Sequence, residues 1–159
     1  MTLLPIFRER WIVPLLWWPS TLGLATLVAA ELHSGAPGTR AVVPYAVLLP
    51  LAVLLLAAGS RGRITVADGV LHVPGARIPV KHLASGEALD REAFRVQTGP
   101  MADPAAFVVS RPWLHQAVRL MVDDPDDPTP YWVVGTRRPQ ELLAAISAAA
   151  AAGAAPRPR

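Results

Sequence analysis

Cysteine is absent from this chain of 159 residues, and Lys81 is its only lysine. The absence of cysteine excludes disulfide bonds, thiol nucleophiles and cysteine-based zinc sites. The net charge of +3 and the pI near 10.2 therefore come from arginines scattered among acids. Because the chain has no basic run and no basic stretch interleaved with aromatic residues, the composition argues against a nucleic-acid partner.

Charge is also scarce in residues 1–60, which carry only Arg8, Glu9, Arg10, Glu31 and Arg40. The chain is 52% hydrophobic, and the apolar excess lies in this first part. We therefore expect a membrane anchor over residues 1–60 and a cytoplasmic β domain with a C-terminal helix over residues 61–151. Residues 152–159 read as a disordered tail.

Two apolar runs, about 11–32 and 41–58, predict two transmembrane helices. The glycine- and proline-rich segment between them allows only a tight reversal, which predicts a helical hairpin. Pro14 and Pro19 indicate that the first helix is kinked or begins later. Glu31 lies in the last turn of the first run, where its carboxylate can reach water.

Arginines predict the orientation of this hairpin. Arg8 and Arg10 precede the first run and Arg61 and Arg63 follow the second, whereas the intervening loop has only Arg40. Positive charge favours the cytoplasmic side, so we expect a multi-pass protein of the cell membrane with both termini in the cytoplasm. A cleaved signal peptide in place of the first span stays open as an alternative, and it would leave the later domain cytoplasmic.

From residue 63 apolar and polar residues alternate, which is typical of strands. Asp68-Gly69 predicts a two-residue hairpin loop that sets Val66 opposite Leu71. Pro74-Gly75 predicts a type II turn into a third strand.

Further along the chain, three more apolar stretches predict strands, and the residues between Asp90 and Gly99 predict a short helix. A final helix is predicted from Pro139, with a stripe formed by Leu142, Leu143 and Ile146. The predicted class is α+β: a transmembrane hairpin, then one small antiparallel sheet curled into a partial barrel, similar in element order to pleckstrin-homology-like domains, with the last helix over its open end.

The stretch DDPDDPTP carries Asp123, Asp124, Asp126 and Asp127. The acids come in adjacent pairs, each followed by proline, and no glycine allows the bend of a calcium loop. We interpret the stretch as a rigid, solvated hairpin turn. A docking loop for a basic partner, an ion pair with Arg137 and Arg138, and a divalent metal site are the alternatives.

Arg111 and Trp113, in the tripeptide RPW, predict a turn at a strand end with the tryptophan in the core. The alternative is an Arg/Trp tip that contacts lipid headgroups. The four histidines, His33, His72, His82 and His115, lie in different predicted elements without zinc-ligand spacing. Because no nucleophile-elbow or phosphate-loop motif occurs either, we expect no catalytic residue, metal or cofactor.

Four stretches carry a family resemblance: RERWIVP, VPYAVLLPLAV, ADGVLHV and above all DDPDDPTPYWVVGTRRPQEL. They resemble the family known as domain of unknown function 3093, small alanine-rich proteins of high-GC bacteria. The resemblance covers the chain to about Ala145 and implies a two-span membrane protein. The family carries no assigned activity, so the resemblance implies no catalytic residue.

The sequence therefore predicts a membrane-anchored, non-catalytic cytoplasmic domain that binds a protein partner or lipid headgroups. One alternative is an enzyme that uses the aspartate stretch with Arg137 and Arg138 on a lipid or phosphorylated substrate. The other is an accessory subunit whose hairpin packs into a larger membrane complex.

Overall fold

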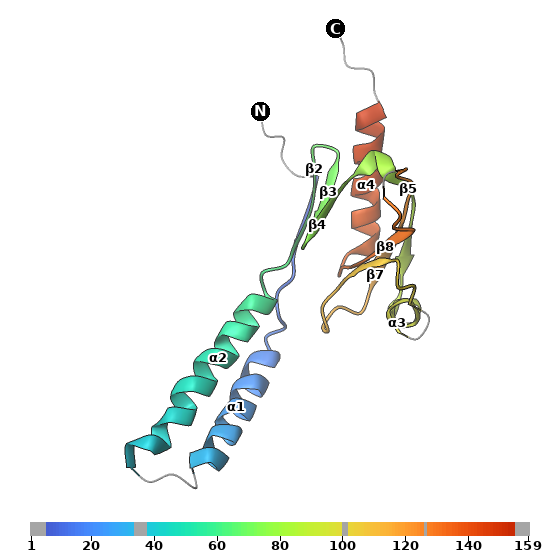
Figure 1. Cartoon of the computed structure of the whole chain (residues 1–159). Coiled ribbons are helices and arrows are strands. Elements are labelled where there is room, and N and C mark those ends of the chain that lie inside the picture. The colour runs from blue at the N-terminus through green and yellow to red at the C-terminus, as the bar shows by residue number, and fades with distance from the viewer. Residues whose placement is uncertain (1–5, 34–37, 100–101, 126, 155–159) are drawn as a thin grey trace. The chain divides into compact units, whose positions relative to one another are not determined.

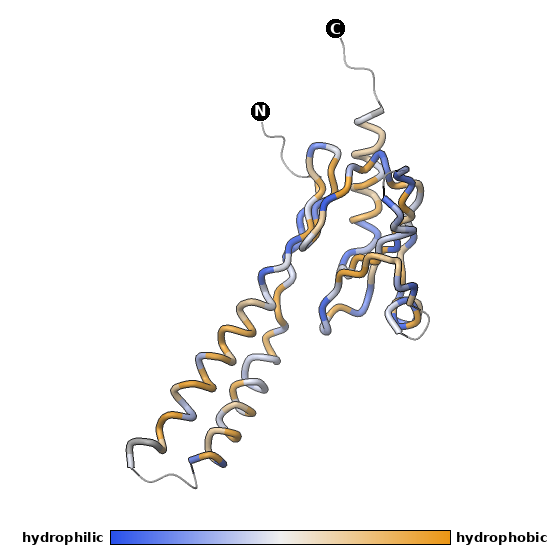
Figure 2. Tube along the Cα trace, viewed as in Figure 1, coloured by the Kyte–Doolittle hydropathy of each residue, from blue (hydrophilic) through white to orange (hydrophobic). Residues whose placement is uncertain are grey.

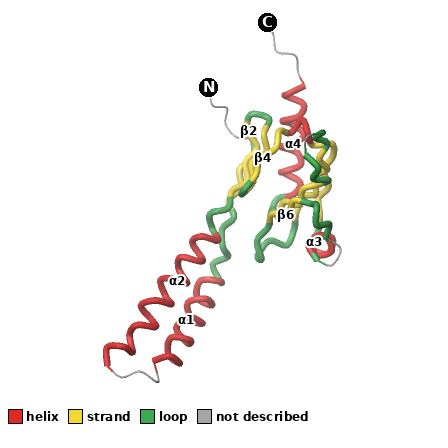
Figure 3. The backbone as a smooth tube through the Cα atoms, viewed as in Figure 1, coloured by secondary structure: helices red, strands yellow, loops and turns green. Residues whose placement is uncertain are grey.

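The computed structural model describes residues 6–33, 38–99, 102–125 and 127–154. The chain divides into two compact units (Figures 1 and 3). Trp11–Arg61 form the hairpin unit, and Met1–Arg10 together with Gly62–Arg159 form the β unit. Residues 7–10, which were expected in the anchor, therefore belong to the β unit.

The hairpin unit consists of α1 (Trp17–His33), the 3-10 turn η1 (Gly38–Val42) and α2 (Val43–Gly59). The first helix begins six residues later than Trp11, the start of the apolar run. Residues before Trp17 form a turn instead, in which the N–H of Trp17 donates to the carbonyl of Pro14 at 3.0 Å. Proline prevents a continuous helix through this segment because it lacks the N–H that a helix interior requires.

Both helices of the hairpin unit have 17 residues, which corresponds to about 25 Å. The apolar core of a bilayer is about 30 Å thick. Among the described residues, no helix combines the length and the apolar character needed to cross a membrane. The prediction of two transmembrane spans at 11–32 and 41–58 is therefore not supported, because the turns around Pro14 and η1 shorten both helices.

Small residues lie at the contact between α1 and α2. Ala29 and Ala52 are buried there, together with Leu56. At the closed end of the hairpin, Nδ1 of His33 lies 3.1 Å from the carbonyl oxygen of Ala41. At the open end, the N–H of Val13 donates to Oγ of Ser60 at 3.3 Å. Contacts near both ends of the hairpin unit therefore involve the segments that flank the helices.

The first sheet of the β unit is antiparallel in the order β1 (Phe7–Arg10), β2 (Arg63–Ala67), β3 (Val70–Val73) and β4 (Ala76–Pro79). The predicted register is confirmed, with Val66 opposite Leu71. Asp68 and Gly69 both have positive φ, at 52° and 70°, as the hairpin turn requires. Gly75 has φ of 89°, as predicted for the second turn.

Strand β1 was not predicted. It pairs with β2, so that Phe7 lies opposite Val66 although the whole hairpin unit separates them in the sequence. The alternation in Phe7–Arg10 is a strand signal, since Phe7 and Glu9 are buried and both arginines are exposed. Four residues beside a long apolar run are too short a signal to be read with certainty.

The second sheet has the order β5 (Leu83–Leu89), β7 (Ala117–Val122), β8 (Tyr131–Gly135) and β6 (Phe107–Val109). Strand β6 pairs in parallel with β8, whereas the other pairs are antiparallel. The predicted single curled antiparallel sheet, or partial barrel, is therefore wrong. The chain after β6 passes to the far side of β8 before β7 begins, which places β6 at an edge and leaves two open sheets.

Helix α4 (Pro139–Ala154) packs against strands of both sheets. Its buried stripe comprises Leu142, Ala145, Ile146 and Ala149. Leu143, predicted in that stripe, lies against β5 instead: a Cβ built on Gly86 would be 2.5 Å from its Cδ2 atom. A side chain at position 86 would therefore require Leu143 and Leu120 to shift. The helix reaches Ala154, and the remainder of the predicted tail lies outside the described residues.

The predicted short helix is confirmed as α3 (Arg91–Thr98). The Asp90 carboxylate caps its start by accepting a hydrogen bond from the N–H of Ala93 at 2.9 Å. Phe94 attaches the helix to the second sheet, in a buried cluster with Leu89 and Val133.

Candidate functional site

The aspartate stretch connects β7 to β8, where the sequence placed it. The two strands pair up to Met121 and Tyr131, and the N–H of Val122 donates to the carbonyl of Pro130 at 3.1 Å. Asp126 lies outside the described residues. The other three aspartates therefore belong to one hairpin loop at the end of the second sheet.

Hydrogen bonds inside this loop fix Asp127. Its Oδ1 accepts the N–H of Thr129 at 2.9 Å, which is the geometry of an Asx turn. The hydroxyl of Thr129 and then its backbone N–H lower the pKa of the Asp127 carboxyl below its usual value. The Asp127 carboxylate therefore stabilises the turn through its hydrogen bonds with Thr129.

Asp124 and Asp123 hold the loop against η2 (Val80–His82). A carboxylate oxygen of Asp124 lies 3.6 Å from Nδ1 of His82. The N–H of Asp123 donates to the carbonyl of His82 at 2.8 Å. The described residues contain no group of three or more acidic or histidine side chains arranged to hold a metal ion.

Arg137 and Arg138 follow the opposite end of β8 from the aspartate loop. The strand has five residues, so roughly 17 Å of extended chain separates the two groups. The described structure thus does not bring these aspartates and arginines into one catalytic arrangement.

Sequence reasoning did not identify Glu9 as a contact of the segment around Arg137. Glu9 is a buried acidic residue with 6% of its surface exposed. Its carboxylate accepts a hydrogen bond from the hydroxyl of Thr136. It also accepts the N–H of Arg137 at 3.0 Å. Because these donors directly precede α4, Glu9 connects β1 to the start of that helix.

Arg138 adds further contacts between β1 and the start of α4. Its guanidinium donates to the carbonyl of Arg8 at 2.8 Å and to Glu141 at 3.0 Å. It also lies 4.9 Å from the centre of the Phe7 ring. We call Glu9, Thr136, Arg137 and Arg138 the latch, because they bind β1 to the start of α4.

The RPW segment forms a tight turn, as predicted. The N–H of Leu114 donates to the carbonyl of Arg111 at 2.9 Å, with Pro112 and Trp113 between them. The core position predicted for Trp113 is occupied by Leu114, which is buried, whereas Trp113 is half-buried. Arg111 donates to the neighbouring carbonyl of Ser110 at 3.3 Å.

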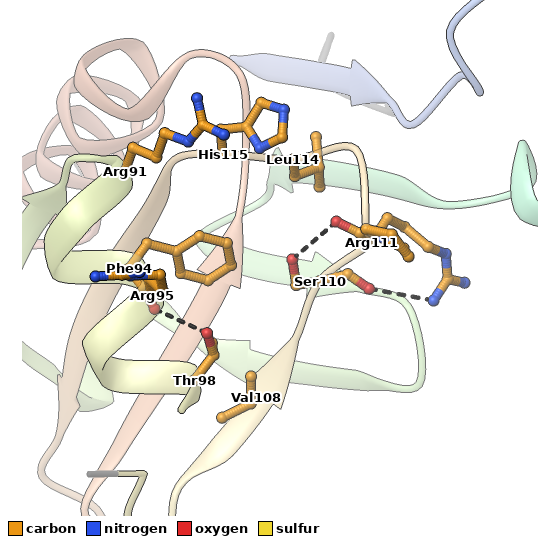
Figure 4. Close-up of a pocket in the computed structure, with 10 residues that line it drawn as sticks. Arg91, Phe94, Arg95, Thr98, Val108, Ser110, Arg111, Leu114 and His115 are labelled. Carbon is orange, nitrogen blue, oxygen red and sulfur yellow. Dashed lines mark hydrogen bonds between the residues drawn. The ribbon is translucent and has the colours of Figure 1, made fainter. Parts of the chain in front are cut away.

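A hollow of about 600 Å³ opens between α3 and this turn (Figure 4). Arg91 and Phe94 line it from α3, and Ser110, Leu114 and His115 line it from the turn. Arg91 and His115 also line an adjoining hollow, which Trp113 and Arg137 share. The sequence singled out Arg111, Trp113 and Arg137, but it gave no sign that the turn faces α3.

The two helices of the hairpin unit are mostly apolar along their length (Figure 2), and many of their large side chains are exposed. Leu15 is 85% exposed and Leu55 is 64% exposed. The other exposed large apolar side chains on its two helices and their flanks include Leu16, Trp17, Leu24, Leu27, Val28, Leu32, Val42, Val43, Val47, Leu51, Val53 and Leu54. They occur around both helices, so this surface is not a single amphipathic stripe.

Two exposed hydroxyl groups on α1 donate hydrogen bonds to backbone carbonyls one turn earlier in the chain. Ser20 donates to the carbonyl of Leu16 at 2.9 Å, and Thr26 donates to that of Leu22 at 2.8 Å. Such bonds satisfy the hydroxyl hydrogens without water. These two hydroxyl groups are therefore compatible with apolar surroundings, and Glu31, the one acidic residue of α1, lies in its last turn.

The outward face of the first sheet is cationic. Arg10 lies directly opposite Arg63, and a second row crosses the sheet through Arg8, Thr65, His72 and Arg77. The arginines and His72 are exposed, and no carboxylate stands among these cross-strand neighbours. Like charges opposite each other repel, so this face favours an anionic partner.

A model of a protein family, described as protein of unknown function (DUF3093), matches residues 6–146. The chain belongs to the DUF3093 family. No curated protein and no solved structure matches it. The similarity to pleckstrin-homology-like domains thus has no matching structure behind it.

The DUF3093 match begins just before β1 and ends within α4. Both halves of the latch, the hairpin unit and the two sheets therefore lie inside the family region. The resemblance noted in the sequence is confirmed at the level of the family, and its two-span membrane description is not supported.

Proposed function

We propose that this DUF3093 chain is a non-catalytic binding module that is anchored to a lipid bilayer by its hairpin unit. The β unit remains at the cytoplasmic surface of that bilayer and binds its partner there. The observation that carries the proposal is the apolar surface around α1 and α2.

The energetics of this surface favour lipid as its neighbour. Moving a fully exposed leucine out of water gains about 1.5–3 kcal/mol, and the helices expose many such side chains. A helix that is apolar on all sides is found inside a large core or in a membrane. The hydrogen bonds of Ser20 and Thr26 to the backbone of α1 lower the cost of placing these two hydroxyl groups in an apolar environment.

The cationic face of the first sheet supports a position of the β unit on the cytoplasmic side of the bilayer. Strands β1 and β2 lead directly into and out of the hairpin unit, so both ends of the hairpin leave the bilayer on one side. Arginines near a cytoplasmic leaflet are attracted to its anionic lipids by about 1 kcal/mol each. Arg10 and Arg63 occupy the ends of the two strands nearest the hairpin.

Vesicle flotation of the full chain tests the anchor. Leu24→Arg combined with Leu54→Arg should abolish flotation, since an arginine inside a bilayer costs about 3 kcal/mol. The matched control is Val96→Arg with Val108→Arg, which places the same charges at exposed apolar positions of the β unit. The control should float like the wild type, and equal losses in both variants would overturn the proposal.

An accessory subunit is a second candidate, favoured by Gly23. This glycine is exposed on α1, and a Cβ built there meets nothing within 4 Å. Small exposed residues let a second helix approach closely in lipid. Gly23→Leu should then disrupt a stoichiometric complex purified in mild detergent while flotation persists, and an unchanged complex would remove this candidate.

A further inference from the structure

The hollow between α3 and the RPW turn has two chemically different parts. One wall is apolar, where Figure 4 shows the Phe94 ring pointing from α3 toward the segment that carries Ser110 and Leu114. The other part is lined by basic side chains: Arg91 and His115 line both this hollow and the adjoining one, which Arg137 also lines. Its size is within the usual range of pockets for small molecules.

The ionisable side chains that line this hollow are all basic. Four basic side chains, Arg91, Arg95, Arg111 and His115, line it, and none of its described lining residues is acidic. Arg95 is paired with Glu92 at 2.7 Å. Within the described part of the chain, Arg91 has no acidic partner. It therefore has donors available for a ligand.

We propose that this hollow binds an organic phosphate with an apolar body. The phosphate lies between Arg91 and His115, near Arg137, and the apolar body lies along Phe94 and Leu114. The inference goes beyond the membrane anchor and does not depend on it.

The geometry favours phosphate over carboxylate. A single guanidinium satisfies a planar carboxylate with two parallel hydrogen bonds. Here the basic side chains come from three separate segments: Arg91 from α3, His115 from the residues before β7, and Arg137 from the residues after β8. A phosphate monoester has three terminal oxygens that accept donors from different directions.

Calorimetric titration of the full chain in a non-ionic detergent tests the site. Phenyl phosphate should bind saturably and about tenfold more tightly than inorganic phosphate, because only the former has a ring to bury. The double variant Arg91→Gln and His115→Gln should weaken phenyl phosphate binding by at least about tenfold. Both side chains are exposed, so the fold should be retained. If the double variant did not fold, Arg91→Gln alone should show a smaller loss.

Arg119→Gln is the matched control, since Arg119 lies on β7, pairs with Glu87 at 2.8 Å and lines a different hollow. It should leave the affinity unchanged within about twofold. Short-chain phosphatidic acid identifies the source of the phosphate: tighter binding than phenyl phosphate indicates a lipid headgroup, and weaker binding indicates a soluble phosphate. Absence of saturable binding by both, or an equal loss in the Arg119 variant, would overturn the inference.

Discussion

Leucine has opposite surroundings in the two units of this chain. In the β unit, Leu71 and Leu142 are completely buried. In the hairpin unit, Leu15 and Leu55 have most of their surface exposed. The β unit thus encloses its own core, whereas the hairpin unit presents its apolar side chains outward.

This difference separates two sources of stability. The β unit removes its apolar surface from water by folding, so its stability depends on packing within the chain. The contact between α1 and α2 buries few residues, mainly alanines. The hairpin unit therefore gains most of its burial from whatever surrounds it, which we propose is lipid.

Truncating one leucine in each unit should show this contrast most clearly. Leu142→Ala should lower the free energy of unfolding of the β unit by about 2–5 kcal/mol because it leaves a cavity. Leu55→Ala should change it by less than about 0.5 kcal/mol, since that side chain is 64% exposed and belongs to the hairpin unit. Urea unfolding followed by circular dichroism measures both, and similar losses would contradict the contrast.

The latch offers the next largest effect. Glu9→Ala should lower the free energy of unfolding by about 2–3 kcal/mol, because the Thr136 hydroxyl and the Arg137 N–H lose a charged acceptor in a buried site. The control is Glu92→Ala, whose carboxylate is 72% exposed in its pair with Arg95, and whose loss should be below about 0.5 kcal/mol. Faster amide exchange at Arg137 in the Glu9 variant alone would locate the effect, and equal losses would exclude a special role for Glu9.

The cationic face should contribute less, and only at an anionic surface. Arg63→Ser and Arg77→Ser should each weaken binding to anionic vesicles by about 1 kcal/mol. The loss should disappear with neutral lipids and shrink as salt rises, because exposed charges are screened. Arg119→Ser, at an arginine of β7 that already pairs with Glu87, is the control. A comparable loss in that variant would indicate a general charge effect.

The aspartate loop should give the smallest change. The lowered pKa of Asp127 means that its charge stabilises the folded chain above the ordinary carboxyl pKa, and that this contribution is lost as the pH falls through the lowered value. Asp127→Asn keeps an acceptor for the N–H of Thr129 but removes the charge. Thermal unfolding should therefore separate wild type and variant slightly at neutral pH and not at all in strong acid. A gap that widened with acid would refute this sign.

Local chemistry made much of the β unit predictable. The Asp68-Gly69 turn, the turn at Gly75 and the cap at Asp90 each depend on a few adjacent residues, and all three are present as predicted. The hairpin unit was recognisable from its apolar runs, but the ends of its helices were not, because proline near an end shortens a helix by an amount that depends on the next turn.

Pairings between distant residues could not be predicted in this way. Glu9 and Thr136 are 127 positions apart, and neither local sequence contains a pattern that predicts their contact. The parallel pairing of β6 with β8 has the same origin, since a three-residue strand carries no signal of its direction. The RPW turn was predicted, yet the hollow it forms with α3 depends on the position of the whole sheet.

Labelling of single cysteines tests the central claim most directly, because the chain has no cysteine of its own. An environment-sensitive fluorophore attached at Leu54→Cys in the hairpin unit is compared with the same label at Val96→Cys in the β unit. On addition of vesicles, the Leu54 label should shift to the blue and be quenched by lipid-bound nitroxides, while the Val96 label stays accessible to aqueous iodide. A Leu54 label that remained as accessible to iodide as the Val96 label would contradict a hairpin surrounded by lipid.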